Sequence, residues 1–543
     1  MFALRLLLPL CLVPILAAEP APTISAERIK SDVKTLASDE FLGRSPGELG
    51  EERTIAFLAD AFKAAGLEPA GDNGTWYQDV PLVRFDRQPG AQLTLKIAGK
   101  SIPLVLGKNA SLSLRNPDQT TLTDAPLVFA GYGVVDRARG WDAYKDIDMT
   151  GKIAVILAND PDFEGGRDLG FEGRRMAYAG RSGAKAEAAT KAGAAGLLII
   201  HEEAAASYPF TQMGSGDALP TMVLAPLAPA TLKFSSWLAL DVATDLLKKV
   251  GHTLPDLKKR ARDPGFRALP LKDATVSVRG EIKATPFTSH NVLAQIKGAT
   301  RPNEFILYGA HWDANGQNGP DKSGDVIRNG AVDNATGTAE VLEIAREFKA
   351  GEPPARTVLF AAWAAEEKGL LGSEFYASHP LYPLAKTAAV INLDPHVVLP
   401  AARDLELIGV GRTTLEDDFA RLAKTQNLRI TPEPNPEAGW YFRSDHYPFA
   451  KRGVPALAFR AGRDLMEGGT AAGQKIVSAF NTNCYHQPCD QFDEAWTFAG
   501  TAQEATVAYL LGRELAETDR WPQWNDQNEY KPLRAETDAE RKP

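Results

Sequence analysis

Four short apolar segments alternate with helical stretches between about residues 288 and 515. The segments run from Glu304 to Ala310, Thr357 to Trp363, Ala388 to Leu393 and Val454 to Phe459. Strands that alternate with helices form a mostly parallel sheet with helices on both faces. The sequence therefore predicts an α/β fold here, with a mostly parallel sheet flanked by helices.

Polar side chains follow three of these strands, at the point where each strand ends. They are His311 and Asp313 after the first strand, Glu366 and Glu367 after the second and Asp394 after the third, while Asp333 lies where the intervening helix begins. Because the carboxyl ends of parallel strands meet at one edge of a sheet, we expect these side chains to lie close together. One imidazole among several carboxylates suits zinc and, less well, manganese or cobalt. A carboxylate such as Asp333 can also bridge two ions of a metal-assisted hydrolase. The pattern therefore predicts a metal site.

Five sequence strings are similar to those of a known family. GAHWD, GAVDNATG, AAEEKGLLGS, INLD and YHQPCD occur in this order between Gly309 and Asp490. They resemble the metallopeptidase family of the bacterial di-zinc aminopeptidases, which also includes glutamate carboxypeptidase, glutaminyl cyclase and the non-catalytic transferrin receptor. The resemblance covers the whole α/β part of the chain. It implies the zinc exopeptidase fold, two Zn2+ ions and peptide substrates.

The resemblance also assigns roles to single residues. It implies that His311 and Asp394 bind one zinc, that Glu367 and His486 bind the other, and that Asp333 bridges the two. Glu366 is then the general base, Asp313 orients His311, and Tyr485 donates to the oxyanion of the reaction. His446 competes with His486 as a ligand, but the family's ligand lies in the Tyr-His string, which favours His486.

An aromatic segment precedes His446. Trp440, Tyr441 and Arg443, together with Asp445 and His446, are candidates for the pocket that binds the substrate side chain. The aromatic rings favour apolar or large substrate residues. The alternative is that the same rings belong to the hydrophobic core.

Two cysteines, Cys484 and Cys489, lie on either side of Tyr485 and His486. In an oxidising compartment such a pair can form a short disulfide that stiffens the turn carrying a metal ligand. A thiolate zinc ligand and two free thiols are the alternatives.

The first 18 residues predict export. They contain one basic residue, Arg5, an apolar run from Leu6 to Leu16 and two alanines before Glu19, which is the layout of a cleavable signal peptide. The apolar run is shorter than a membrane span, so we expect a secreted or periplasmic protein without a stable membrane anchor. The chain carries 60 Lys and Arg against 69 Asp and Glu, a net charge of −9, so we expect no nucleic acid partner.

Three further parts accompany the zinc peptidase catalytic domain, which we expect over residues 285–520. Residues 19–117 contain two amphipathic helices and are assigned to the N-terminal part of the peptidase domain. Residues 118–284 change to short β-rich runs with an alanine-rich helix from Gly183 to Ala192, and resemble the protease-associated domain inserted in several exported peptidases. Residues 521–543 are polar and without periodicity, so we expect a loosely ordered tail.

Other residues are expected to be structural. Gly43 to Gly47 match the pattern G-x-S-x-G, but no strand precedes Ser45, so we expect a turn and not a nucleophile. His201 is expected at the surface of the inserted domain, and His379 and His396 are expected not to bind metal.

These features together predict an exported di-zinc metallo-aminopeptidase that removes N-terminal residues from peptides. The alternatives are a carboxypeptidase acting on acidic C-termini, a glutaminyl cyclase with one zinc, and a catalytically silent peptide-binding relative. The presence of Glu366 together with Glu367 and Asp394 favours hydrolysis.

Overall fold

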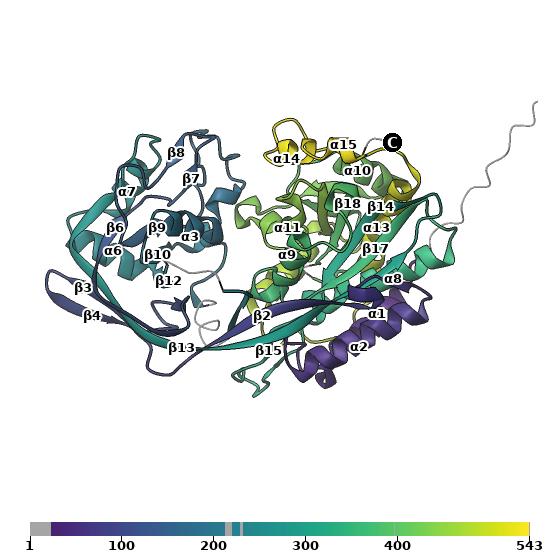
Figure 1. Ribbon diagram of the computed structural model, residues 1–543, viewed down its shortest axis with the longest axis horizontal. Coiled ribbons are helices and arrows are strands. Elements are labelled where there is room, and N and C mark those ends of the chain that lie inside the picture. Colours follow the sequence, from purple (N-terminus) through teal and green to yellow (C-terminus); the bar gives the residue numbers. More distant parts are fainter. Residues whose placement is uncertain (1–22, 212–219, 228–231, 396, 542–543) are drawn as a thin grey trace, which may run out of the picture.

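The computed structural model describes residues 23–211, 220–227, 232–395 and 397–541. These residues form two lobes side by side, a larger α/β lobe and a smaller β-rich lobe (Figure 1). The expected signal peptide, residues 1–18, and His396 lie outside the described residues. Within the described ranges, no helix is long and apolar enough to cross a membrane.

The larger lobe is built on four parallel strands. Their order across the sheet is β17 (Arg356–Trp363), β14 (Arg301–His311), β18 (Thr387–Leu393) and β21 (Ala456–Ala461). β13 (Leu269–Ile296) pairs antiparallel with β17, β19 (Asp404–Ile408) pairs antiparallel with β21, and β20 (Arg429–Pro432) pairs parallel with β19. The predicted strands are therefore present, and the sheet is parallel at its centre.

Helices cover both faces of this sheet. Successive side chains of a strand point to opposite faces, so the apolar strands present hydrophobic side chains on both sides. Ile306 and Tyr308 of β14 belong to one core, and Phe305 and Leu307 belong to another. The first core packs against α1 (Ala26–Leu36), α2 (Leu49–Ala64), α8 (Gly337–Ala350), α10 (Leu415–Thr425) and α13 (Ala499–Glu517). The second packs against α9 (Leu371–Ser378) and α11 (Tyr447–Ala450). The predicted fold class is confirmed.

The helix expected after Asn329 begins later than its sequence pattern suggests. Residues 331–336 form an irregular turn in which Asp333 has φ −111° and ψ 91°, and regular helix starts at Gly337. A Cβ at position 337 would lie 2.2 Å from the carbonyl oxygen of Leu393, so only glycine lets the start of α8 approach the end of β18 this closely. This approach brings Asp333 next to Asp394.

The smaller lobe contains a second sheet with its own core. The strands β6 (Asp118–Phe129), β9 (Ile153–Leu157), β10 (Gly196–His201) and β12 (Phe234–Ala239) are parallel, with α3 (Ser182–Lys191), α6 (Leu240–Lys249) and α7 (Leu254–Ala261) beside them. The hairpin of β3 (Gln92–Ile97) and β4 (Lys100–Leu104) and the end of β2 (Tyr77–Arg87) belong to the same core. This core begins at Val83, so residues 83–117 pack with the smaller lobe and not with the peptidase part to which we assigned them.

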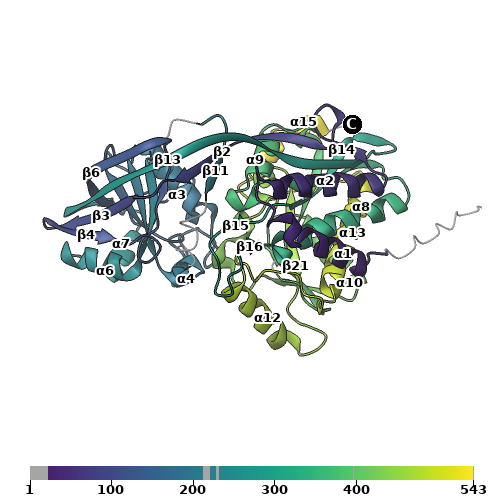
Figure 2. The same cartoon turned by 90° about the horizontal axis from the view of Figure 1, so that it is seen from below.

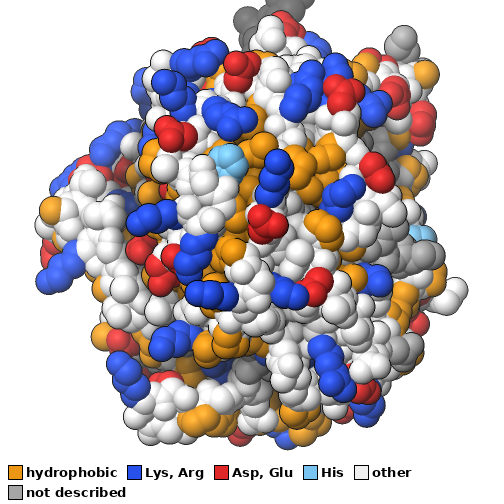
Figure 3. All heavy atoms as spheres, turned by 90° about the vertical axis from the view of Figure 1, so that its left-hand side faces the viewer, with side chains coloured by type: hydrophobic (Ala, Val, Ile, Leu, Met, Phe, Trp, Pro, Cys, Tyr) orange, Lys and Arg blue, Asp and Glu red, His pale blue; other side chains and the backbone are white. Residues whose placement is uncertain are grey.

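The long strand β13 and its antiparallel partner β2 run between the two lobes. β13 is 28 residues long and pairs with β6 and β3 in the smaller lobe, with β2 along its middle and with β17 in the larger lobe (Figure 2). The expected boundary at residue 284 therefore falls inside a continuous strand. On the outer face of the smaller lobe, Lys and Arg side chains lie among Asp and Glu side chains (Figure 3).

Two expectations about burial are wrong. His201 is 3% exposed and contacts the rings of Trp237 and Phe210. The C-terminal segment 521–541 is packed: Trp524 is 1% exposed and donates from Nε1 to the carbonyl oxygen of Gly453 over 2.8 Å. Its helices α14 (Lys531–Ala535) and α15 (Asp538–Arg541) follow. Isolated aromatic residues anchor this polar segment, and such anchors leave no periodic pattern to detect.

Candidate metal centre

The carboxyl ends of the parallel strands bring His311, Glu366, Glu367 and Asp394 to one edge of the sheet. Asp333 reaches the same place from the turn before α8, and His486 from the loop after α12 (Gly469–Asn483). Their donor atoms form two groups, His311 with Asp333 and Asp394, and Asp333 with Glu367 and His486. Asp333 is the member that both groups share.

The distances within the groups are short. His311 Nε2 lies 3.3 Å from Asp333 Oδ1, 3.7 Å from Asp394 Oδ1 and 3.8 Å from Glu366 Oε2. His486 Nε2 lies 3.2 Å from Asp333 Oδ2 and 3.1 Å from Glu367 Oε2. The two oxygens of Asp333 therefore face two different histidines.

The residues present fit two divalent cations. Among the described residues, no hydrogen-bond partner reaches the buried His311 Nε2 or Glu367 Oε1. A buried polar atom without a partner is costly, and a metal ion would satisfy both atoms. Imidazole nitrogens combined with carboxylate oxygens are a donor set that suits zinc. His446 belongs to neither group, which agrees with the choice of His486 over His446.

The electrostatics of the cluster favour the binding of positively charged ions. Burial alone would lower the pKa of His311, but the carboxylates of Glu366, Asp333 and Asp394 raise it well above its ordinary value. Burial raises the pKa of Glu366. Burial would also raise the pKa of Asp333, yet its contacts with His311 and His486 hold that pKa below its ordinary range.

Asp313 contacts the centre through both its carbonyl oxygen and its carboxylate. His311 Nδ1 contacts the main-chain carbonyl oxygen of Asp313 at 3.1 Å, whereas the Asp313 carboxylate lies 3.7 Å from Nδ1. That carboxylate instead accepts the backbone N–H groups of Glu366, over 2.9 Å, and Glu367, over 3.3 Å. Asp313 therefore orients His311 through its carbonyl oxygen and fixes the Glu366–Glu367 turn through its side chain.

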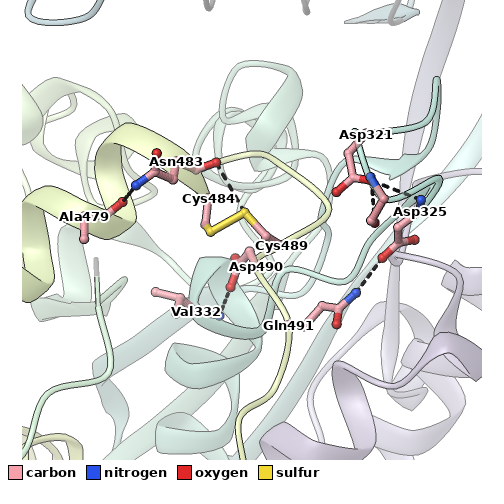
Figure 4. The surroundings of a disulfide bond; sticks show 10 residues. Asp321, Asp325, Val332, Ala479, Asn483, Cys484, Cys489, Asp490 and Gln491 are labelled. Atoms are coloured by element: carbon pink, nitrogen blue, oxygen red, sulfur yellow. Dashed lines mark hydrogen bonds between the residues drawn. A yellow bond between two sulfur atoms is a disulfide. The ribbon is translucent and has the colours of Figure 1, made fainter.

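The turn that carries His486 is cross-linked. Cys484 and Cys489 form a disulfide in the structure, and Asp490, the next residue, points toward Val332 (Figure 4). The Asp490 carboxylate accepts the N–H groups of Val332, over 2.8 Å, and Asp333, over 3.1 Å. This contact ties the His486 turn to the Asp333 turn.

Arg44 is a buried support that the sequence analysis missed. Its guanidinium donates to the carbonyl oxygens of Leu36, Trp312, Asn329 and Gly330 over 2.5 to 2.8 Å. Burial lowers the pKa of Arg44 to about 10, and the charges of Asp490 and Asp313 oppose this shift. The sequence around Ser45 matches only a nucleophile pattern, and nothing in it indicates a role for the adjacent arginine.

The predicted substrate-pocket residues divide into two sets. Trp440, Arg443 and His446 line the cleft beside the donor groups, together with Tyr485. Tyr441 and Asp445 do not line it: Tyr441 is 3% exposed and packs on His446 and Arg412, and Asp445 accepts a hydrogen bond from Ser373 Oγ over 2.5 Å. The alternative of a core role therefore holds for Tyr441.

Tyr485 lies beside His486 at the cleft. Its ring stacks on His486 with centroids 3.8 Å apart, and burial raises its pKa well above the ordinary value, so the hydroxyl keeps its proton. Arg443 Nη2 lies 3.5 Å from that hydroxyl. The Tyr485 hydroxyl is thus a donor at the edge of the cleft that Glu366 and Asp333 line.

A known protein family matches part of the chain. Residues 291–510 match the model of peptidase family M28. Over this segment, the resemblance that the sequence strings indicated is confirmed. The segment contains every residue of the two donor groups.

Individual relatives match over part of their length. The leupeptin-inactivating enzyme 1 of Streptomyces exfoliatus is 28% identical over 253 residues, which cover 43% of this chain and 53% of that protein. The glutamate carboxypeptidase 2 homolog of Caenorhabditis elegans is 29% identical over 224 residues, which cover 36% of this chain and 26% of that protein. The chain thus spans about half or less of the length of these relatives.

Among solved structures, the aminopeptidase from Aneurinibacillus sp. strain AM-1 aligns with 92% of this chain and 95% of its own. The two are 20% identical, with a TM-score of 0.55. They therefore share a fold.

Proposed function

We propose, from its M28 peptidase domain, that the protein is a zinc-dependent aminopeptidase that removes N-terminal residues from peptides. The observation that carries this proposal is the pair of donor groups that share Asp333, with Glu366 beside them and outside both groups. A carboxylate that binds no metal but lies 3.8 Å from a ligand atom is available for proton transfer. A site that only binds metal ions would not need this additional carboxylate.

Two zinc ions fit the donors in our proposal. His311 and Asp394 would hold one, Glu367 and His486 would hold the other, and Asp333 belongs to both donor groups. Zinc bound there supplies a Lewis acid that lowers the pKa of water to near neutrality and polarises the scissile carbonyl. Ser444 Oγ donates to Asp394 Oδ2 over 2.5 Å and so orients this carboxylate.

Glu366 is the general base of the proposed reaction. Its carboxylate takes the proton of the attacking water and passes it to the amine of the leaving residue. The Tyr485 hydroxyl donates to the oxyanion that develops on the scissile carbonyl.

The cleft supports an N-terminal substrate end. Beside Glu366 and Asp394 it has an apolar wall formed by Ile408, Ala458 and Phe459. The carboxylates suit the free amine of a substrate, and the apolar wall suits its first side chain. We therefore favour an aminopeptidase over a carboxypeptidase acting on acidic C-termini.

Export and the identity of the smaller lobe complete the proposal. The layout of residues 1–18 supports a secreted or periplasmic protein, and the parallel strands β9 and β10 with α3 support a protease-associated domain. We propose peptide substrates, no nucleic acid partner and no stable membrane anchor.

A substrate panel tests the proposed function. Purified, zinc-loaded protein is offered aminoacyl p-nitroanilides and, separately, N-acylated dipeptides with acidic C-termini. The proposal expects release of nitroaniline and no cleavage of the N-acylated compounds. The opposite pattern identifies a carboxypeptidase and overturns the proposal.

A further inference from the structure

A segment of the larger lobe that lines the metal cleft lies against the smaller lobe. The segment comprises residues 436–443, which we call the Trp440 segment, and it forms short 3-10 turns. Trp440 and Arg443 line the cleft beside the donor groups. The Trp440 ring meets the ring of Tyr485 edge to face with centroids 6.4 Å apart, and the Arg443 guanidinium lies 4.1 Å above the indole. The path of this segment therefore sets the position of one wall of the cleft.

Two main-chain carbonyl oxygens at the start of the Trp440 segment accept hydrogen bonds from the smaller lobe. The carbonyl oxygen of Pro436 accepts the backbone N–H of Met176 over 3.1 Å. The carbonyl oxygen of Glu437 accepts the side-chain amide of Asn159 over 3.0 Å. The Glu437 carboxylate also forms an ion pair with Arg174, at 3.0 Å. The start of the segment is thus held by donors that belong to the other lobe.

Side chains of the smaller lobe also pack on this segment. Gly439 has φ +63°, and a Cβ at this position would lie 2.7 Å from Met176 Sδ. The ring of Tyr178 packs on that of Phe442 with centroids 5.8 Å apart. Met176 therefore lies directly against the backbone next to Trp440.

Asn159 is fixed by its own lobe in the orientation that this contact requires. It follows β9, is 3% exposed and accepts the backbone N–H of Asp160 at its Oδ1 over 2.9 Å, so that its NH2 group is left to donate. The buried Lys185 donates to the main-chain carbonyl oxygen of Asn159. The Asp160 carboxylate accepts the N–H of Ala177 over 2.9 Å and so places the neighbouring Met176. One buried network thus orients both donors to the Trp440 segment.

We propose that Asn159 and Met176 are positioning residues for substrate binding, because they hold the Trp440 segment in place as a wall of the cleft. The inference rests on the proposed function and adds that the smaller lobe shapes the pocket for the first substrate residue. Trp440 lines the same cleft as Ile408 and Phe459, which we assign to the first side chain. Since contact energy falls steeply with separation, a small displacement of Trp440 weakens the binding of a large side chain more than that of a small one.

The variant Asn159→Asp tests this role. The carboxylate is nearly the same size and still accepts the N–H of Asp160, but it cannot donate to the carbonyl oxygen of Glu437. We expect KM for leucyl p-nitroanilide to rise about five- to ten-fold, with kcat changed by less than about two-fold. KM for alanyl p-nitroanilide should rise less, and the zinc content should stay the same.

A second variant and a control accompany it. Met176→Ala removes the packing against Gly439 but keeps the network of Asn159, and it should change KM in the same direction. Thr253→Ala removes the side-chain cap of α7, which accepts the N–H of Asp256 over 3.3 Å, and so weakens the smaller lobe at a distance from the Trp440 segment. Figure 1 shows α7 on the side of the smaller lobe that faces away from the larger lobe. This control should leave KM for both substrates unchanged.

The outcomes separate this inference from the proposed function. Hydrolysis of leucyl p-nitroanilide by the wild-type protein tests the aminopeptidase activity alone, and its absence refutes the proposed function. If the wild type is active, an unchanged KM in a folded variant refutes the role of the residue replaced and the function stands. An equal loss of kcat for both substrates at unchanged KM would reflect only a loss of folded enzyme and would also overturn the positioning role.

Discussion

The carboxylate of Asp490 accepts the backbone N–H of Asp333 over 3.1 Å and so connects the turn carrying one histidine of the centre to the carboxylate that both donor groups share. Burial raises the pKa of Asp490 to about 7. A buried acid retained directly beneath a donor cluster indicates that the position of Asp333 depends on it.

Replacement of Asp490 by Asn should weaken metal binding. The amide offers one acceptor where the carboxylate offers two, so one of the N–H groups of Val332 and Asp333 loses its partner. We expect zinc affinity to fall about 10- to 100-fold, as for other residues that orient metal ligands. Competition with a chromogenic chelator measures this. The exposed Asp493→Asn serves as control, and equal affinities of Asp490→Asn and wild type would contradict the role given to Asp490.

Loss of Arg44 should destabilise the fold even without metal. Arg44→Gln removes a buried guanidinium that holds four carbonyl oxygens of three segments. We expect the free energy of unfolding of the metal-free protein to fall by about 3 kcal/mol. Urea titration measures it, with the exposed Arg53→Gln as the matched control. A loss as small as that of the control would show that these hydrogen bonds are not needed.

The disulfide should slow the release of zinc. Cys484 and Cys489 close a short loop around Tyr485 and His486, and such a link restricts the conformations that this loop can adopt. In the Cys484→Ser, Cys489→Ser variant, zinc should pass to a chelator faster than in wild type. Thiol labelling of the unreduced wild type provides the check: labelled cysteines together with unchanged zinc release would refute this role.

Stability should decrease as the pH rises, because two carboxyl groups are buried in the larger lobe. Glu340 of α8 and Glu504 of α13 are both 0% exposed. Burial raises the pKa of Glu504 to about 8, and burial with the Glu504 charge raises that of Glu340 well above 4.5. The folded chain therefore keeps protons that the unfolded chain has lost above pH 4.5.

Because the folded chain retains these protons, its stability must fall as the pH rises. The contribution of the two protonated carboxyl groups to the free energy of unfolding is complete below pH 4.5. It decreases as the pH rises toward and beyond 8, with a slope of up to about 1.4 kcal/mol per pH unit for each group. Glu340→Gln should flatten this dependence, whereas the exposed Glu352→Gln should not. Urea unfolding between pH 5 and 9 compares them, and parallel profiles of wild type and Glu340→Gln would contradict the prediction.

The sequence predicted those residues of the metal centre that lie at the ends of strands. His311, Glu366 and Asp394 each come just after an apolar strand, and parallel strands carry such residues to one edge regardless of detail. Their supports could not be predicted in this way. Arg44 lies in a turn far from the other residues in sequence, and its contacts arise only from packing of the N-terminal segment onto the loops of the centre.

Other differences also arise from long-range contacts. β13 reads as separate short runs, because its exposed middle carries no continuous apolar pattern, and its continuity depends on pairing with β2. Tyr441 resembled a pocket residue, yet the guanidinium of Arg412 covers its ring at 4.1 Å.

The most direct test of the central claim compares wild type with Glu366→Ala at equal zinc content. Two zinc ions per chain should be found in both proteins by elemental analysis, since Glu366 is in neither donor group. Hydrolysis of leucyl p-nitroanilide should fall by about 10²- to 10⁴-fold in the variant, the usual contribution of a general base. Undiminished hydrolysis by a fully zinc-loaded Glu366→Ala protein would contradict the account.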